Sequence, residues 1–396
     1  MSIILGLLSI AGVLGIAWLL SNKKKSVNWR TIGVGLAIEG AFVLFVLKVE
    51  AGKVFLQKAS AAVQKVINYS NEGIQFVFGG FYEQTDLTFV FAINVLSVII
   101  FISALVSALY YLRIIPFIVQ LVGVTVGKLM GTTKVESFNA VGNSFLGLAE
   151  APLLVKPYLK ILTRSEIFAV MVGGTASASG AILVGYSLMG VDIKYLLISV
   201  FSVPFVSLVI AKIMEPETDV SQTNDNVKMK RSEHANVFES IAEGTVSGVM
   251  LALNIGGLLI AFISILALLN GMLGFVGTDL STILGYIFYP FALLVGIPMD
   301  EAFRAASIIG TKMSINEFVA FQDLTSQQGQ LSEKTVAMLS VALCNFANLS
   351  SIGQLIIGLG SLEPTKRSQV SKLGLKAIIG GSLASFITAI FVGMFM

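Results

Sequence analysis

The chain has 396 residues, of which 55% are hydrophobic and only 12% are charged, and its net charge is +3. Soluble domains average about 25% charged residues, so this composition excludes an ordinary soluble fold and indicates a membrane protein. The small positive charge lies in short loops, which is a topology signal and not a surface for nucleic acid. One cysteine excludes an internal disulfide, and one histidine leaves little for metal or general-base chemistry.

Eight segments are long and apolar enough to cross a bilayer, which takes roughly 20 residues each. They are residues 3–20, 31–47 (apart from Glu39), 87–112, 167–189, 195–213, 244–278, 335–362 and 377–396. The first has no basic residue before Lys23, so we expect a membrane span and not a cleaved leader. In residues 51–81, apolar residues recur about every four positions and lysines lie between them. This pattern predicts an amphipathic helix on the outer membrane surface.

Two further segments, residues 135–158 and 300–323, are predicted to enter and leave the membrane on the same side. The first contains GNSFLGLAEAPLLVKP, which places a carboxylate, Glu150, between glycines and prolines. A carboxylate at membrane depth is expensive and is rare unless it faces a cavity or a ligand. Broken backbone at that depth is tolerated only when it is buried in protein or lines a site. This combination indicates a transporter.

The two halves of the chain resemble each other weakly. A glycine precedes a glutamate in Gly142…Glu150 and again in Gly310…Glu317, and each is followed by a small polar patch, GGTASASG and CNFANLSSIG. Broken segments in corresponding halves indicate inverted repeats around a binding site at the membrane midplane. The predicted fold is therefore an all-α polytopic membrane protein with eight transmembrane helices and two re-entrant hairpins.

Glu150 and Glu317 are the central candidate residues, because intramembrane acids are functional by default. The structural alternative is that each forms a local salt bridge, with Lys156 and Lys312 respectively. Asn348 shares a helix face with other amides and hydroxyls that suit a polyhydroxylated neutral solute.

Broken backbone can also expose carbonyl oxygens to a hard cation. Asn143 and Ser177, with carbonyls nearby, could bind sodium, although Ser177 alone is equally explained as one small residue in a packing patch.

From Ser137 onward the chain resembles the concentrative nucleoside transporter family. The resemblance is carried by GNSFLGLAEAPLLVKPYL, SEIFAVMVGGTASASGAILVGY, TNDNVKM, LALNIGGLLIAF, GTKMSINEFVAF and CNFANLSSIGQLIIGLG, in this order. It implies a homotrimer in a bacterial plasma membrane, in contact with lipid, that imports nucleosides with sodium and needs no other cofactor. A scaffold would hold moving transport parts that carry the solute in an elevator-like movement.

On this resemblance the chain divides into five parts. They are residues 1–113 (scaffold helices and outer amphipathic helix), 114–214 (first hairpin and transport helices), 215–235 (cytoplasmic linker), 236–278 (scaffold helix) and 279–396 (second hairpin and transport helices).

The resemblance also implies roles for individual residues. Glu317, Asn348 and Ser351 would bind the ribose hydroxyls, and Phe346 would be an aromatic contact. Glu150 and Ile182 would lie on the nucleobase side. The sodium ligands would be the side chains of Asn143 and Ser177 and the carbonyls of Leu146 and Ala178.

One departure from the family pattern concerns the tip of the first hairpin. Many members read GQTE or GQSE there, whereas this chain reads GLAE, with Leu148 and Ala149 in place of the polar residues. An unpaired polar edge on the ligand costs about 1–3 kcal/mol, and a purine ring offers more apolar face in return. We therefore expect a preference for purine nucleosides.

Three alternatives remain open at the level of sequence. Glu150 or Glu317 could carry a proton in place of sodium coupling. A membrane-embedded enzyme lacks an evident nucleophile–base pair or metal site. A receptor or scaffold would bind its ligand without moving it.

Overall fold

The computed structural model describes residues 2–83, 90–148, 150–223, 227 and 234–396, and every long regular element in them is a helix. The main helices are α1 (Ile3–Leu19), α2 (Trp29–Lys48), α3 (Glu50–Glu83), α4 (Ser97–Tyr111), α5 (Ile114–Met130), α6 (Lys134–Gly142), α7 (Arg164–Ala176), α8 (Gly180–Leu188), α9 (Ile193–Met214), α10 (Val237–Gly274), α11 (Leu280–Val295), α12 (Met299–Ser314), α13 (Glu317–Gln327), α14 (Glu333–Leu343), α15 (Ser351–Leu362) and α16 (Arg367–Phe395). A π-helical turn η2 (Ala92–Leu96) precedes α4, and a 3₁₀ segment η3 (Ala151–Ile161) follows α6; shorter 3₁₀ turns are η1 (Lys24–Ser26), η4 (Gln328–Gln330) and η5 (Pro364–Lys366). The predicted all-α fold class is confirmed.

Six helices of the described part are long and apolar enough to cross a membrane, or seven if α11 and α12 count as one broken span. The axes of α11 and α12 differ by 118°. The predicted span at residues 335–362 falls short of the necessary length because it is divided into α14 and α15. The count of eight spans therefore remains a prediction.

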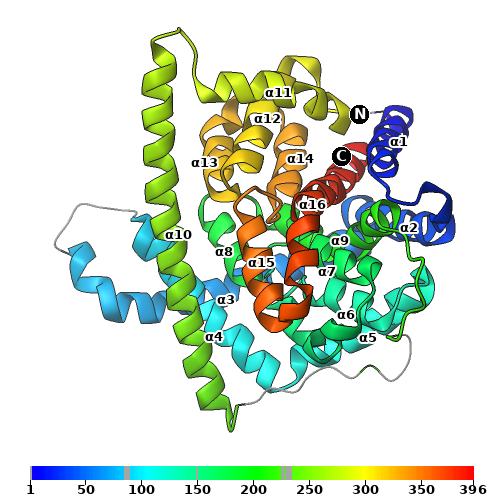
Figure 1. Cartoon of the computed structure of the whole chain (residues 1–396). Coiled ribbons are helices and arrows are strands. Elements are labelled where there is room, and N and C mark those ends of the chain that lie inside the picture. Colours follow the sequence, from blue (N-terminus) through cyan, green and yellow to red (C-terminus); the bar gives the residue numbers. More distant parts are fainter. Residues whose placement is uncertain (1, 84–89, 149, 224–226, 228–233) are drawn as a thin grey trace.

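Two packing groups can be followed in Figure 1. The long helix α10 stands at one side of the molecule and packs along α4. A Cβ atom at Gly248 of α10 would lie 2.8 Å from the Cα atom of Ile100, so only glycine allows this approach of the two backbones. On the other side α16 lies among α7, α9 and α14, with α1 and α2 packed on α9 and α16.

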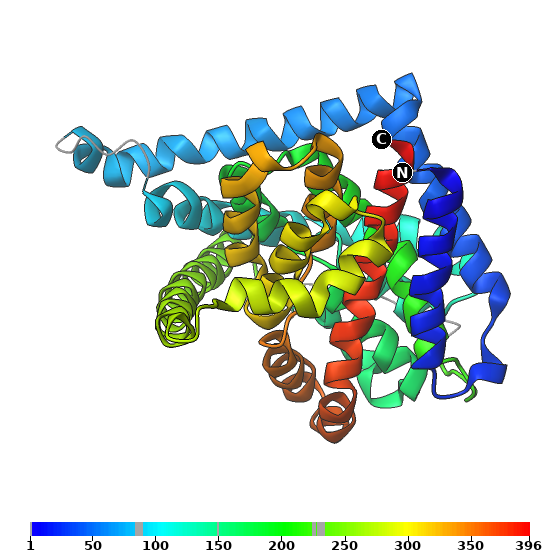
Figure 2. The same ribbon diagram turned by 90° about the horizontal axis from the view of Figure 1, so that it is seen from above.

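The amphipathic segment predicted at residues 51–81 is one continuous helix, α3, of 34 residues. Figure 2 shows it running along one edge of the molecule. Two other helices, α5 and α11, were not expected from the sequence. Both lie next to a predicted hairpin, since α5 packs on α6 and α11 packs on α12.

The two predicted hairpins fold as α6 with η3 and as α12 with α13. Helix α6 begins with a capping box, in which Thr133 Oγ1 accepts from the backbone N–H of Glu136 and the Thr133 N–H donates to the Glu136 carboxylate. The return segment η3 has Pro152 in its first turn and Pro157 inside it, and proline removes a backbone donor. Proline chemistry thus keeps this limb of the hairpin from becoming a regular α-helix.

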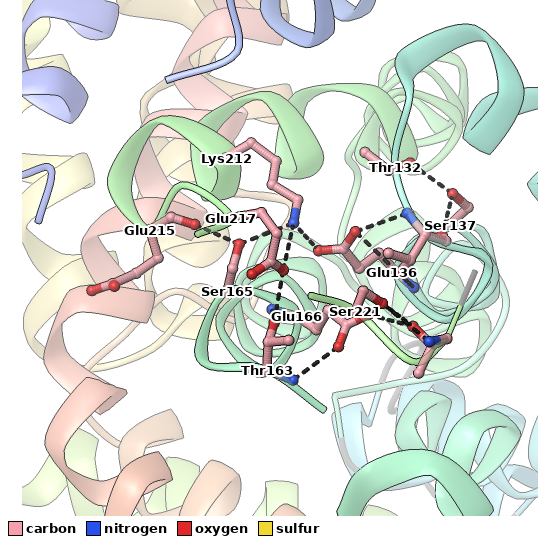
Figure 3. A network of polar contacts seen from close by, with 12 residues as sticks. Thr132, Glu136, Ser137, Thr163, Ser165, Glu166, Lys212, Glu215, Glu217 and Ser221 are labelled. Atoms are coloured by element: carbon pink, nitrogen blue, oxygen red, sulfur yellow. Dashed lines mark hydrogen bonds and ion pairs between the residues drawn. The ribbon is translucent and has the colours of Figure 1, made fainter. Parts of the chain in front are cut away.

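A buried polar network fixes the base of the first hairpin to the end of α9 (Figure 3). Lys212 forms an ion pair with Glu136 of α6, and its ammonium donates to Ser165 Oγ of α7 at 2.9 Å. Glu217 lies 3.8 Å from the same ammonium and accepts from Thr163 Oγ1 at 2.7 Å. The linker after α9 is therefore held at the end of α9 and the start of α7, and Lys212 joins the same network to α6.

Glu215, the first residue of this linker, links four parts of the chain. Its carboxylate accepts from Asn22 after α1, from Arg164 at the start of α7 and from Lys376 of α16, at 2.6–3.2 Å. Burial alone would raise the pKa of this carboxyl, but the hydrogen bonds from Arg164 and Lys376 lower it below its usual value. The linker predicted at residues 215–235 thus begins as a packed segment.

Candidate functional site

The centre of the molecule contains two broken helices that meet at their breaks. Helix α7 ends at Ala176 and α8 begins at Gly180, whereas α14 ends at Leu343 and α15 begins at Ser351. The backbone N–H of Phe346, in the second break, donates to the carbonyl of Ser177, in the first, at 3.0 Å. Unwound backbone is tolerated within a membrane only where it is buried or lines a site.

The hairpin tips reach the same place. The carbonyl of Phe145, at the first tip, accepts from the N–H of Gly180 at 3.3 Å, and the N–H of Leu349 donates to the carbonyl of Met313, close to the second tip, at 3.1 Å. Ser144 Oγ donates to the carbonyl of Val200 in α9 at 2.8 Å. That carbonyl is available because residue 204 is a proline, which has no N–H to bond it. Both predicted hairpins therefore end at the two helix breaks.

Glu317 opens helix α13 after an Asn316 cap and is 4% exposed. Its carboxylate accepts from Asn348 Nδ2 at 2.8 Å. The amide oxygen of Asn348 in turn accepts from the backbone N–H of Ser351 at 3.1 Å and from its Oγ at 3.2 Å. The structure thus brings Glu317, Asn348 and Ser351 into one buried chain of hydrogen bonds, and Phe346 lies in the same break.

The structural alternative for Glu317, a salt bridge to Lys312, is not formed. In the described part of the chain no ion pair within 4 Å joins the two residues, and the buried Lys312 ammonium donates instead to Asn345 Oδ1. The matching pair of Glu150 and Lys156 is likewise absent from the ion pairs of the described residues. No local sequence signal indicated that Lys312 would hold Asn345 in the second helix break.

Tyr186 of α8 is a second residue that the sequence analysis missed. Its ring packs on Phe318 and Phe321 of α13, at centroid distances of 5.0 and 4.5 Å. Its hydroxyl lies near the Glu317 carboxylate but, in the described structure, outside hydrogen-bond geometry. An aromatic residue in an apolar span gives no signal of such a position, because most pack in the same way.

The residues predicted to bind sodium lie together at the first tip and the first break. Ser177 Oγ lies 3.5 Å from Asn143 Oδ1, and both side chains are fully buried. Among the described residues, the carbonyl oxygens of Leu146 and Ala178 accept no hydrogen bond. Two buried carbonyls without donors beside an amide and a hydroxyl form an oxygen-rich set of the kind that hard cations prefer.

The first hairpin tip presents an apolar side chain to α7. Leu148 is 4% exposed and lies so close to Gly174 that a Cβ there would be 2.4 Å from its Cδ1 atom. Ala149 lies outside the described residues. Glu150 accepts from the N–H of Gly147 at 2.6 Å, and Ile182 is buried in the first turn of α8.

Glu150 is exposed and lines a cavity of about 370 Å³ between the first hairpin and the pair α4–α10. The other side chains of this cavity include Leu146 and Ser179 near the first break, and Ser107 and Leu251 on α4 and α10. None of Glu317, Asn348 and Ser351 lines it. The structure therefore gathers the predicted ribose residues and the predicted sodium residues, but leaves Glu150 on a separate, open side.

Comparison with known proteins identifies the family. Residues 195–393 and 8–81 match "Na+ dependent nucleoside transporter C-terminus" and "N-terminus", and residues 92–192 match "Nucleoside recognition". The chain is 43% identical to "Uncharacterized transporter YutK" of Bacillus subtilis, with all of both chains covered. It is 41% identical to "Nucleoside permease NupC" of Helicobacter pylori, over 96% of this chain and 95% of the relative.

Two solved structures are closely similar to this chain over almost its whole length. An inward-facing, substrate-bound structure of CNTnw has 40% identity and a TM-score of 0.95, with 99% of each chain covered. An outward-facing structure of a CNTnw variant has 38% identity and a TM-score of 0.94, over 100% of this chain and 98% of that one. The relatives are permeases, which move a solute and do not convert it. The chain belongs to the Na⁺-dependent nucleoside transporter family and is an integral membrane transporter, not an enzyme.

Proposed function

We propose that this protein imports purine nucleosides into the cell, driven by a sodium gradient, with the solute held where the hairpin tips and the helix breaks meet. The observation that carries this proposal is the buried chain of hydrogen bonds from Glu317 through Asn348 to Ser351. A carboxylate with a neighbouring amide and hydroxyl offers acceptors and donors to the paired hydroxyl groups of a ribose.

Each end of that chain has a distinct task in the proposal. Glu317 accepts from ribose hydroxyls, because a charged acceptor forms hydrogen bonds worth about 1.5–3 kcal/mol. Asn348 donates to the carboxylate, Ser351 donates to Asn348, and both complete the polar side of the site. Phe346 offers its ring as an apolar wall.

The coupling ion in the proposal is sodium, bound by Asn143, Ser177 and the carbonyls of Leu146 and Ala178. This site is joined to the second break, because the carbonyl of Ser177 in the first break accepts from the N–H of Phe346 in the second. An ion that orders this backbone would therefore also order the ribose side, which is how binding of the two would be linked.

The residues proposed for the base side are Leu148, Ala149, Glu150 and Ile182, of which Glu150 lines the neighbouring cavity. An apolar Leu148 cannot read the polar edge of a pyrimidine, whereas the larger purine face gains about 25 cal/mol per Å² of apolar contact. The proposed preference is for inosine, guanosine or adenosine over uridine and cytidine.

Membrane assembly and movement complete the proposal. In the proposal the protein is a homotrimer in the bacterial plasma membrane, with lipid around it. The hairpins and broken helices are proposed to move together against α4 and α10. The cavity beside Glu150 lies along that boundary.

The test is uptake of labelled inosine into proteoliposomes, with an inward sodium gradient or with choline in its place, and with excess uridine as competitor. We expect sodium-driven accumulation that uridine barely suppresses. Accumulation driven only by a proton gradient would overturn the coupling ion, and suppression by uridine as strong as by unlabelled inosine would overturn the purine preference.

A variant of the hairpin tip tests the purine preference more directly. Leu148→Gln restores an amide at the tip, so uridine should compete up to roughly a hundredfold better than in the wild type. Leu129→Gln makes the same change at an exposed position of α5 and should leave competition unchanged. If both variants keep the wild-type profile, Leu148 does not read the base.

A further inference from the structure

Glu39 is a buried acid that the proposed transport site does not use. It lies at the middle of α2, about 14–15 Å along the helix axis from either end. Its side chain is 0% exposed, and within the described structure neither carboxylate oxygen has a hydrogen-bond partner. The buried acids Glu136, Glu166 and Glu317 differ, because each accepts from named donors.

The surroundings of Glu39 are polar but uncharged. Helix α2 packs on α9 and α16, and the hydroxyls of Ser202 on α9 and Thr388 on α16 face the carboxyl group. Ser202 Oγ also lacks a partner among the described residues. A Cβ at the neighbouring Gly40 would lie 2.9 Å from the Phe391 ring, so α16 leaves little space here.

Within the described residues no counter-charge pairs with the carboxyl group. On α2, α9, α16 and α5 the charged and titratable groups lie towards the helix ends: Arg30 and Lys48 on α2; Lys194, Tyr195 and Lys212 on α9; Arg367, Lys372 and Lys376 in the first third of α16; and Lys128 on α5. The long helix α3, which leaves the bundle, carries Glu50, Lys53, Lys58, Lys65, Tyr69 and Glu72 among the residues whose side chains are described. None of them pairs with Glu39 in the described structure. An isolated ionised carboxylate in such a place is too costly to persist, so it takes up a proton.

We propose that Glu39 is a proton-binding site, in which one proton is held on a neutral carboxylic acid between Ser202 and Thr388. The acid O–H donates to one hydroxyl and the other oxygen accepts from the second, since a hydroxyl can do both. The proton links α2 to α9 and α16, whatever solute the protein carries.

The consequence for stability has a definite sign. An unfolded glutamate ionises near pH 4.3, whereas ionising Glu39 in the folded protein would leave an unpaired charge buried among uncharged groups. The unfolded state therefore binds fewer protons, and stability falls as pH rises. Glu39→Gln replaces the neutral acid by a neutral amide of similar shape and removes this dependence.

The experiment compares the full-length wild type with Glu39→Gln in nanodiscs. Infrared difference spectra at neutral pH should show the carbonyl stretch of one protonated carboxylic acid that the variant lacks. The melting temperature of Glu39→Gln should exceed that of the wild type by an amount that grows by several degrees from pH 5 to pH 8. Glu50→Gln, at the exposed start of α3, should change neither measurement.

Two results would overturn the proposal. One is an unchanged acid band in Glu39→Gln, and the other is a melting difference that does not vary with pH. If Glu39→Gln does not fold, Ser202→Ala serves in its place, because loss of one hydroxyl partner should shift the acid band of Glu39. A band that stays unshifted in Ser202→Ala would also count against the site.

Discussion

The buried acids of this helical bundle differ in their hydrogen-bond partners. Glu317 and Glu39 are both buried, yet Glu317 has an amide partner at 2.8 Å and, among the described residues, Glu39 has no hydrogen-bond partner. A partnered acid can receive a ligand hydroxyl at a small further cost, whereas an isolated acid must be neutral. In the two proposals the same residue type therefore serves solute recognition in one place and proton binding in the other.

Replacing Glu317 tests the ribose side directly. Glu317→Gln removes the charge but keeps the shape, and hydrogen bonds to a charged group are worth about 1.5–3 kcal/mol, or roughly 10- to 150-fold in affinity. We expect inosine uptake near background and at least a tenfold loss of nucleoside affinity in a binding assay. Glu333→Gln, the same change at the exposed start of α14, should transport normally. Wild-type affinity in Glu317→Gln would refute the ribose role.

Replacing Ser177 tests the ion side. Ser177→Ala removes one of the proposed ligands, a loss of about 1–2 kcal/mol that raises the half-saturating sodium concentration about 5- to 30-fold. Maximal uptake at saturating sodium should fall much less. Ser207→Ala removes another buried hydroxyl, one without a hydrogen-bond partner in the described structure, and should leave the sodium titration unchanged. Coincident titrations of the wild type and Ser177→Ala would remove Ser177 from the ligand set.

At the scale of elements, the sequence predicted the hairpins and the long amphipathic helix, because glycines, prolines and four-residue spacing are local signals. It predicted residues 167–189 and 335–362 as continuous spans, although the patches GGTASASG and CNFANLSSIG contain the two helix breaks. It did not predict α5 and α11, whose apolar runs stop short of a full span. Nor could it predict the network of Figure 3, because Lys212 and Glu136 are far apart in the chain and meet only through packing.

That network makes a prediction about how firmly the first hairpin is anchored. Lys212→Met leaves the Glu136 carboxylate buried beside an apolar side chain, which costs about 3–5 kcal/mol of stability. The melting temperature should fall by several degrees, and the double variant Lys212→Met with Glu136→Gln should recover most of the loss. Lys194→Met breaks an exposed ion pair with Asp192 and should cost about 1 kcal/mol or less. Equal losses for Lys212→Met and Lys194→Met would show that the buried network adds no special stability.

The packing of the whole molecule bears on which parts move together. The predicted scaffold, residues 1–113, includes α1 and α2, yet these helices pack on α9 and α16 of the predicted transport part. Helices α4 and α10 pack on each other, and Ser107 and Ser240 join them with hydroxyl oxygens 2.9 Å apart. Packing therefore favours assigning α1 and α2 to the proposed moving part and α4 and α10 to the proposed fixed part. The proton proposed on Glu39 would then lie inside one body and need not be released during transport.

A disulfide across the proposed boundary can test this division. A Cβ on Gly185 of α8 would lie 3.5 Å from Val95 Cγ1 in η2, a spacing that a disulfide can span. Oxidation of a Val95→Cys, Gly185→Cys variant should therefore lock α8 to α4 and abolish sodium-driven uptake, and a reducing agent should restore it. The matched control is Ser107→Cys with Ser240→Cys, which joins α4 to α10 within the fixed part and should leave uptake intact. The native Cys344 is buried and should take no part. If the oxidised Val95→Cys, Gly185→Cys variant still transports, α8 and α4 move together and the proposed division fails at this boundary. Loss of uptake in the oxidised control variant alone would mean that α4 and α10 must slide past each other.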